Sequence, residues 1–163
     1  MEHPLTHERL KELFSYNPNT GLFTRLVATA NRTYVGEIAG YQNTIGYTIL
    51  RVDYKIYYAH RLAWFYMTGE WPSKHIDHID GKKSNNCFAN LRNASQAENM
   101  QNVTKARKDS SSGFLGVFKN RNKWTACIGI DGKLKYLGIF NTPELASEAY
   151  LAAKRELHPF GIL

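Results

Sequence analysis

Residues 77–99 read DHIDGKKSNNCFANLRNASQAEN, and their pattern is the most informative about the fold. This stretch begins in a short β-like segment that ends at the turn dipeptide Asp-Gly, residues 80–81. A polar loop follows, and a second short strand is expected from Asn90. Ser95 and Glu98 then form a capping box, which marks the start of a helix. The predicted order is strand, loop, strand and helix.

Four side chains of this stretch are suited to chemistry: Asp77, His78, Asn90 and Asn99. Adjacent strand residues point to opposite faces, so Asp77 can bind a metal while His78 faces a substrate. The helix can return Asn99 to Asp77, giving oxygen ligands for a hard ion such as Mg²⁺ or Mn²⁺. An unperturbed histidine pKa of about 6.5 suits a general base, and Asn90 is expected to orient the ring of His78.

These residues resemble an HNH endonuclease, with Asp77-His78, Asn90 and Asn99 at the family's three positions. The resemblance implies a ββα-metal finger that cuts one DNA strand per site, leaving a 3′-hydroxyl and a 5′-phosphate. It implies that Asp77 and Asn99 bind the metal, that His78 is the base and that Asn90 orients His78. Asn99 replaces the more frequent His, as in the subgroup that resembles phage and intron homing enzymes. The alternative is a polar loop whose Asp, Asn and Gly only satisfy turns.

The part before this stretch, residues 1–58, is predicted to be rich in β-structure. Thr6 can cap a short helix, and its apolar positions are Leu10, Leu13 and Phe14. Short strands are expected in residues 21–27, 36–41 and 47–58, with a hairpin turn at Asp53-Tyr54. Residues 60–67 then predict a helix that ends before Gly69.

The net charge is +7, and residues 104–163 hold 10 basic and 5 acidic side chains. Such an excess favours a polyanionic partner, most commonly nucleic acid. Residues 104–112 are interpreted as a linker. Beyond it, GFLGVF, KWTACIGI and KLKYLGIF predict three antiparallel strands, with a two-residue turn at Asp131-Gly132, and Thr142-Pro143 begins a helix that covers one face.

Residues 113–163 resemble an Apetala2-type DNA-binding domain through LGV at 115–117, WTACI at 124–128, YLGIF at 136–140 and TPELASEAYLAA at 142–153. The resemblance implies that the sheet lies in the DNA major groove. From the two-residue period, Leu137 and Ile139 are expected against the helix, together with Trp124, Ala126, Ile128 and Ile130. Tyr136 is expected on the outer face. Most sheet arginines of the plant-type pattern are missing here, so either base specificity is modest or Arg121, Lys123 and Tyr136 carry it.

Several cations are expected at DNA phosphates. Outside the third module they are Arg61, Lys82 and Lys83, and around its sheet they are Lys119, Arg121, Lys123, Lys133 and Lys135. A solvated basic face is the alternative for the sheet, and a packed, hydrogen-bonded role is expected for His60. Asp80, Asn85 and Asn86 are expected to hold the loop by hydrogen bonds to the backbone.

The sequence thus predicts an α+β protein: a β-rich segment at 1–58, a ββα-metal (His-Me finger) nuclease core at 59–103, the linker, and a three-stranded sheet on one helix at 113–163. The predicted function is a Mg²⁺-dependent homing endonuclease acting on double-stranded DNA; the alternative is a DNA-binding regulator with a decayed nuclease finger. A monomer would nick one strand, and a double-strand break would need a dimer or a second binding event. Two cysteines and no long apolar run exclude a disulfide scaffold and a membrane span, so the host cytoplasm is the expected compartment.

Overall fold

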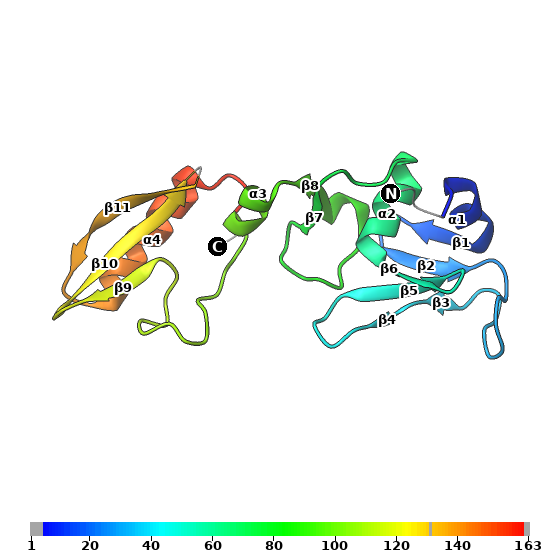
Figure 1. The fold of residues 1–163 in the computed structure, drawn as a ribbon, viewed down its shortest axis with the longest axis horizontal. Helices are drawn as coiled ribbons and strands as arrows, with labels where there is room; N and C mark the ends of the chain where they lie inside the picture. The colour runs from blue at the N-terminus through cyan, green and yellow to red at the C-terminus, as the bar shows by residue number, and fades with distance from the viewer. Residues whose placement is uncertain (1–4, 131, 162–163) are drawn as a thin grey trace. The chain divides into compact units, whose positions relative to one another are not determined.

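The computed structural model describes residues 5–130 and 132–161. The chain divides into two compact units, Met1–Ala94 and Ser95–Leu163, which are described separately below. Both contain helices and small antiparallel sheets, in agreement with an α+β fold (Figure 1).

The N-terminal unit opens with α1 (His7–Leu13), which is capped by the Thr6 hydroxyl as predicted. Phe14 was expected on this helix, but it has extended backbone angles and begins β1 (Phe14–Asn17). Strand β1 pairs with β2 (Leu22–Arg25), and β2 pairs with β3 (Ile38–Ala39). The ring of Phe14 contributes to the core of this unit.

A second sheet is formed by β4 (Tyr41–Gln42), β5 (Thr48–Val52) and β6 (Lys55–Tyr58). The predicted hairpin turn at Asp53-Tyr54 is confirmed, because Val52 pairs with Lys55 across it. Leu50 and Val52 are buried while Arg51 is exposed, so one face of the sheet packs on the core.

Helix α2 (Ala59–Thr68) follows β6 directly and ends at Gly69, in the left-handed conformation that glycine favours. The predicted helix over 60–67 is therefore confirmed. Its buried residues Leu62 and Ala63 join Leu10 and Leu50 in one hydrophobic core. This core fixes α2 beside the sheet that precedes it.

Residues 75–94 form β7 (His75–His78), a 3₁₀ turn η1 (Phe88–Asn90) and β8 (Leu91–Ala94), with β7 and β8 antiparallel. Helix α3 (Gln96–Gln101) starts at the predicted capping box, in which Ser95 and Glu98 exchange two hydrogen bonds. The order strand, loop, strand and helix is confirmed. The closed ββα-metal arrangement stays a prediction, because α3 belongs to the C-terminal unit.

The C-terminal unit contains β9 (Val117–Asn120), β10 (Lys123–Ile130) and β11 (Lys133–Phe140), with β10 in the centre, and α4 (Pro143–Leu157) on one face (Figure 1). The first strand was predicted from residue 113 but starts later, because Gly113 and Gly116 have positive φ angles. Ile130 pairs with Lys133, although Asp131 of the predicted turn lies outside the described residues.

The expected position of Ile139 against α4 is wrong. The pairing of β10 with β11 shifts by one residue after Ala126, which leaves Leu137 as an additional residue on β11. Ile139 therefore lies opposite Thr125 and is 48 % exposed, while Phe140 packs on the core with Leu137. A β-bulge changes which residues share a face, and the two-residue period alone does not reveal it.

Two contacts within the C-terminal unit connect α4 and the segment after it to the end of α3. Lys154 is buried, and its Nζ donates a hydrogen bond of 2.7 Å to the carbonyl of Val103. The backbone N–H of Phe160 donates to Oε1 of Gln101 at 3.3 Å. Burial lowers the pKa of Lys154, so this hydrogen bond is what offsets the desolvation of its ammonium group. Helix α3 is thus part of the packing of this unit.

Candidate active site

Asp77 and His78 are both buried, and each has a different partner. The Oδ2 atom of Asp77 accepts hydrogen bonds from Nε and Nη2 of Arg92, at 2.9 and 2.6 Å. Arg92 is directly opposite Asp77 in the register of β7 and β8. Arg92 was not among the residues predicted for the site, although cross-strand pairing of opposite charges is a common source of sheet stability. The arginine balances a carboxylate that would otherwise be costly to bury.

The ring of His78 is oriented by Asn86. Nε2 of His78 lies 3.2 Å from Oδ1 of Asn86, and Nδ2 of Asn86 donates to the carbonyl of Ser84 at 3.2 Å. The second contact fixes the amide with its oxygen toward the histidine. An amide oxygen only accepts, so it takes the Nε2 proton and the lone pair of the neutral ring is on Nδ1. Burial lowers the pKa of His78, which favours this neutral form near pH 7.

The orienting role predicted for Asn90 stays a prediction, while its side-chain amide is bonded to the loop. Its Nδ2 donates to Oδ1 of Asp80 at 2.9 Å and to the carbonyl of Asn85 at 2.8 Å. Its Oδ1 accepts from the backbone N–H of Asp80 at 3.0 Å. Asn90 lies in the 3₁₀ turn where the loop closes, and there its side chain bonds to loop atoms.

The expectation that Asp80, Asn85 and Asn86 hold the loop is confirmed. Asp80 accepts from the backbone N–H of Lys82 at 2.8 Å and from Nδ2 of Asn85 at 2.7 Å. Burial by itself would raise the pKa of Asp80, but its hydrogen bonds from Asn85, Lys82 and Asn90 outweigh it and the pKa is lowered. The loop between β7 and β8 is thus internally bonded around an ionised carboxylate.

Tyr47 and His60 lie beside His78, Tyr58 lies beside both of them, and neither tyrosine was predicted at the site. The ring centroids of His60 and Tyr47 lie 5.1 and 6.0 Å from that of His78, and Tyr58 stacks on His60 at 5.4 Å. Desolvation, then the charges of His78 and Arg61, lower the pKa of His60 to about 3. The predicted packing of His60 is confirmed, but within the described part of the chain its Nδ1 has no hydrogen-bond partner.

The cations predicted near the loop lie in three different settings. Nζ of Lys83 donates to the carbonyl of Ile45 at 3.2 Å and is 4.9 Å from the centroid of the Tyr47 ring. Arg61 is half-buried on α2 and donates to the carbonyl of Pro72 at 3.4 Å. Lys82 is exposed. Their contact with phosphate stays a prediction.

The turn between β1 and β2 packs directly on the loop that carries Asn86. The hydroxyl of Tyr16 donates to the carbonyl of Asn86 at 2.7 Å, and the N–H of Phe88 donates to the carbonyl of Pro18 at 2.8 Å. A Cβ atom on Gly21 would lie 2.3 Å from the carbonyl carbon of Asn86. Glycine is therefore required for this close approach, which connects the β1–β2 turn to the orientation of His78.

The donor atoms present suit a hydrated hard ion better than a transition metal. Among the residues that the structure describes, no three His, Cys, Asp or Glu side chains are grouped as a metal site. Asp77 offers a carboxylate, and Asn99 lies on α3 about one turn from its start, as predicted. Carboxylate and amide oxygens with remaining water ligands fit Mg²⁺. The approach of Asn99 to Asp77 stays a prediction.

Comparison with known proteins adds two findings. Residues 57–101 match the family described as HNH endonuclease. The chain is also 33 % identical over 116 residues to Protein 3.8 of Escherichia phage T7, covering 67 % of this chain and 94 % of that protein. The chain belongs to the HNH endonuclease family. No solved structure matches it significantly.

The HNH match spans α2, β7, β8 and α3, which supports a nuclease that acts on DNA. HNH nucleases generally use a divalent metal ion, in agreement with the donors described above. The match ends at residue 101, so an Apetala2-type C-terminal module stays a prediction. Within residues 5–130 and 132–161, no helix is long and apolar enough to cross a membrane.

The DNA-contact residues predicted for the C-terminal unit are exposed. They are Lys119 on β9, Arg121 in the following turn, Lys123 on β10, and Lys133, Lys135 and Tyr136 on β11. Tyr136 lies opposite Cys127, on the face of the sheet that α4 does not cover. Phe118 and Ile139 are exposed on the same face, on either side of Thr125. Lys123 alternates with Thr125 along β10 and lies on this face too, whereas Lys119, Lys133 and Lys135 are opposite Trp124, Ile130 and Ile128, on the side of α4.

Proposed function

We propose that this HNH protein is a metal-dependent DNA endonuclease of the homing type, which hydrolyses phosphodiester bonds and nicks one strand per catalytic site. The observation that carries the proposal is the geometry of His78. Asn86 holds its Nε2 proton, which directs the basic Nδ1 away from the amide. A histidine in this state is prepared to accept a proton from water near neutral pH.

Asp77 and Asn99 would hold the metal ion, for which Mg²⁺ or Mn²⁺ fits the oxygen donors. When bound, the ion supplies positive charge that stabilises the developing charge on the phosphate. Nδ1 of His78 accepts the proton of the attacking water, and Asn86 keeps the ring from rotating. Arg92 balances Asp77 and keeps the carboxylate oriented on β7. Lys83, which lies over the ring of Tyr47, and Arg61 on α2 would serve as phosphate contacts.

The C-terminal unit is proposed to be the main DNA anchor, through the sheet face that α4 leaves uncovered. Lys123→Ala removes one positive charge from that face, because Lys123 alternates with Thr125 and Cys127 along β10. If Lys123 contacts a phosphate, the slope of log K against log salt should flatten by about 0.9. Arg155→Ala on α4 is the control, because it removes an exposed charge from the element on the opposite face. Equal effects per charge in both variants would contradict this assignment.

The nuclease itself is tested by nicking of supercoiled plasmid with Mg²⁺, with Mn²⁺ and with EDTA. His78→Ala is expected to lower the rate ~10²–10⁴-fold, the usual contribution of a general base. His75→Ala, on the exposed end of the same strand, should cleave at the wild-type rate. Circular dichroism of both variants checks that the fold is retained. DNA binding without any cleavage by the wild type would instead favour a regulatory protein with an inactive nuclease finger.

A further inference from the structure

The outer face of the β4–β5–β6 sheet carries exposed aromatic and apolar side chains around the buried Ile49. Arg51 on β5 lies opposite Ile56 on β6, and Ile49 lies opposite both Tyr58 on β6 and Tyr41 on β4. Of these, Arg51, Ile56, Tyr58 and Tyr41 are exposed, whereas Leu50 and Val52 point into the core. Exposed apolar and aromatic side chains gathered on one face are typical of an interaction surface.

One end of this face is continuous with the proposed catalytic site. Tyr58 stacks on His60 with ring centroids 5.4 Å apart. Tyr47, which immediately precedes β5, contacts both Tyr58 and His78, at 5.4 and 6.0 Å. A substrate whose reacting phosphate lies at His78 therefore meets this sheet face next.

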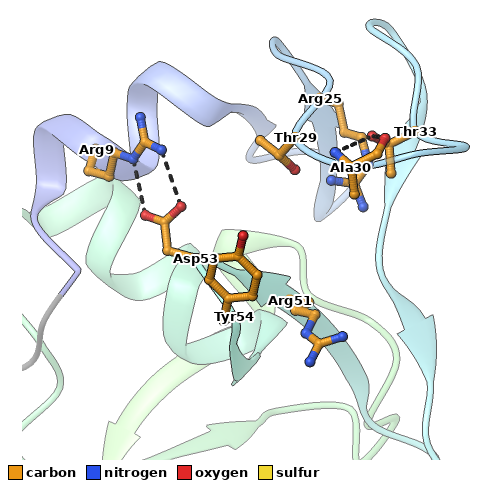
Figure 2. Close-up of a pocket in the computed structure, with 8 residues that line it drawn as sticks. All are labelled: Arg9, Arg25, Thr29, Ala30, Thr33, Arg51, Asp53 and Tyr54. Atoms are coloured by element: carbon orange, nitrogen blue, oxygen red, sulfur yellow. Dashed lines mark hydrogen bonds and ion pairs between the residues drawn. The ribbon is translucent and has the colours of Figure 1, made fainter.

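The other end of the face opens into a basic pocket of about 490 Å³, shown in Figure 2. Its lining residues are Arg9, Arg25, Thr29, Ala30, Thr33, Arg51, Asp53 and Tyr54. Arg9 is neutralised, because Nε and Nη2 donate to Asp53 at 3.1 and 3.2 Å. The guanidinium of Arg51 has no hydrogen bond or ion pair with any described residue. The pocket thus offers a cation whose charge is not used internally.

The hairpin tip beside Arg51 presents a tyrosine in an unfavourable conformation. Tyr54 is 93 % exposed with a φ of 66°, and Asp53 before it has a φ of 42°. Two-residue turns of this type favour Asn-Gly because side chains are disfavoured at positive φ. The ion pair of Asp53 with Arg9 holds the tip in place, and Figure 2 shows the Tyr54 ring between that pair and Arg51. Folding gains little from such a residue, which favours a role in contact with a partner.

The length of β5 gives the distance between the two ends of this face. At about 3.3 Å per residue, Arg51 is about 13 Å along the strand from Tyr47, and the hairpin tip at Asp53 is about 20 Å away. Successive phosphates of one DNA strand are about 3.4 Å apart along the helix axis. The strand therefore spans roughly four to six nucleotides, measured from the residue that contacts His78.

We propose that the outer face of β4–β5–β6 binds the DNA duplex flanking the scissile bond, with Arg51 on a backbone phosphate roughly four to six nucleotides from the cleaved position and Tyr54 against the adjacent sugar. The proposal rests on the nuclease function above, because the cleaved position defines the origin of the count. It assigns a DNA contact to the N-terminal unit itself, in addition to the one proposed for the C-terminal sheet.

The first experiment measures binding of the full chain to a 40-base-pair duplex in EDTA over a salt series. Arg51→Ala should weaken binding roughly tenfold, as expected for the loss of one charged hydrogen bond, and lower the salt slope by about 0.9. Tyr54→Ala should weaken binding without changing the slope, because no charge is removed. Lys55→Ala is the matched control: Lys55 is exposed on the same hairpin but pairs with Val52, on the opposite face.

The second experiment locates the contact. The nick made by the wild type with Mg²⁺ is mapped, and neutral methylphosphonates are then placed one at a time along a duplex that spans it. Substitutions four to six nucleotides from the nick should weaken binding of the wild type and of Lys55→Ala. They should have no effect on Arg51→Ala, which has already lost the contact.

The outcomes separate this proposal from the nuclease assignment. If the wild type nicks DNA but Arg51→Ala keeps the wild-type affinity and salt slope, the surface is not a DNA contact. If Lys55→Ala loses as much DNA affinity as Arg51→Ala, the loss reflects the change in net charge, and the proposal is overturned. If the salt series behaves as expected while the wild type cuts nothing, the DNA contact stands and the nuclease function fails.

Discussion

The amide oxygen of Asn86 lies 3.2 Å from Nε2 of His78, and the backbone carbonyl of the same asparagine accepts a hydrogen bond of 2.7 Å from Tyr16. Asn86 therefore connects β1, seventy residues earlier in the chain, to the proposed base. Orientation of a general base needs such a rigid partner, because proton transfer depends on direction as well as on pKa. Asn86 acts here as a positioning residue.

Replacing Asn86 tests that role. Asn86→Ala removes the acceptor, so the ring of His78 can rotate and change tautomer, and kcat for nicking should fall about 10- to 100-fold. The apparent KM for DNA should change little, because Asn86 is buried and does not face the substrate. Asn86→Asp keeps an acceptor oxygen and should retain more activity than Asn86→Ala. A parallel rise in KM in both variants would indicate a merely structural role.

The pair of Asp77 and Arg92 should contribute to stability as well as to the site. Arg92→Met removes two hydrogen bonds from a buried carboxylate and should lower the free energy of unfolding by about 2–3 kcal/mol. Asp77→Asn should lower the free energy of unfolding by less, because the cation that it leaves without its partner, Arg92, is more exposed than Asp77. The variant that carries both Arg92→Met and Asp77→Asn should be more stable than the sum of the two single losses predicts. Urea unfolding of all four proteins measures this coupling, and strict additivity would contradict it.

The glycine between the N-terminal hairpin and the nuclease loop gives a steric test. Gly21→Ala places a Cβ within 2.3 Å of the backbone of Asn86 and should lower both the melting temperature and the nicking rate. Gly36→Ala is the control, because Gly36 also has a positive φ, of 85°, but its Cβ would meet open space. Gly36→Ala should cost only about 1 kcal/mol of backbone strain. Equal losses in the two variants would mean that the close approach to Asn86 is unimportant.

His60 should make the protein sensitive to acid. Burial lowers its pKa in the folded state to about 3, whereas the unfolded chain titrates near the ordinary value of 6.5. Between these values the unfolded state binds a proton that the folded state does not, so stability falls as the pH decreases below 6.5. One proton contributes at most about 1.4 kcal/mol per pH unit.

His60→Gln removes this titration, and the slope of unfolding free energy against pH from 6.5 to 4.5 should become shallower. His75→Gln, which changes an exposed histidine, should leave the slope unchanged. Denaturant unfolding at a series of pH values gives both slopes. An unchanged slope in His60→Gln would show that the ring is already protonated in the folded protein.

Local signals in the sequence determined much of the fold. The caps at Thr6 and Ser95, the hairpin turn at Asp53-Tyr54 and the stop at Gly69 depend on neighbouring residues, and each occurs where it was predicted. The nuclease family could also be read from residues 77–99, because the spacing of Asp77, His78, Asn90 and Asn99 is a property of the chain alone.

Only the tertiary structure decided which residues surround His78. The amide of Asn86 reaches the ring because the loop folds back on itself, and Tyr47 and His60 come from elements that no local pattern connects to β7. Similarly, Ile139 is exposed because one additional residue enters β11, a change of register that depends on pairing with β10. Sequence fixes local geometry through short-range sterics and hydrogen bonds, whereas contacts between distant segments depend on how the whole chain packs.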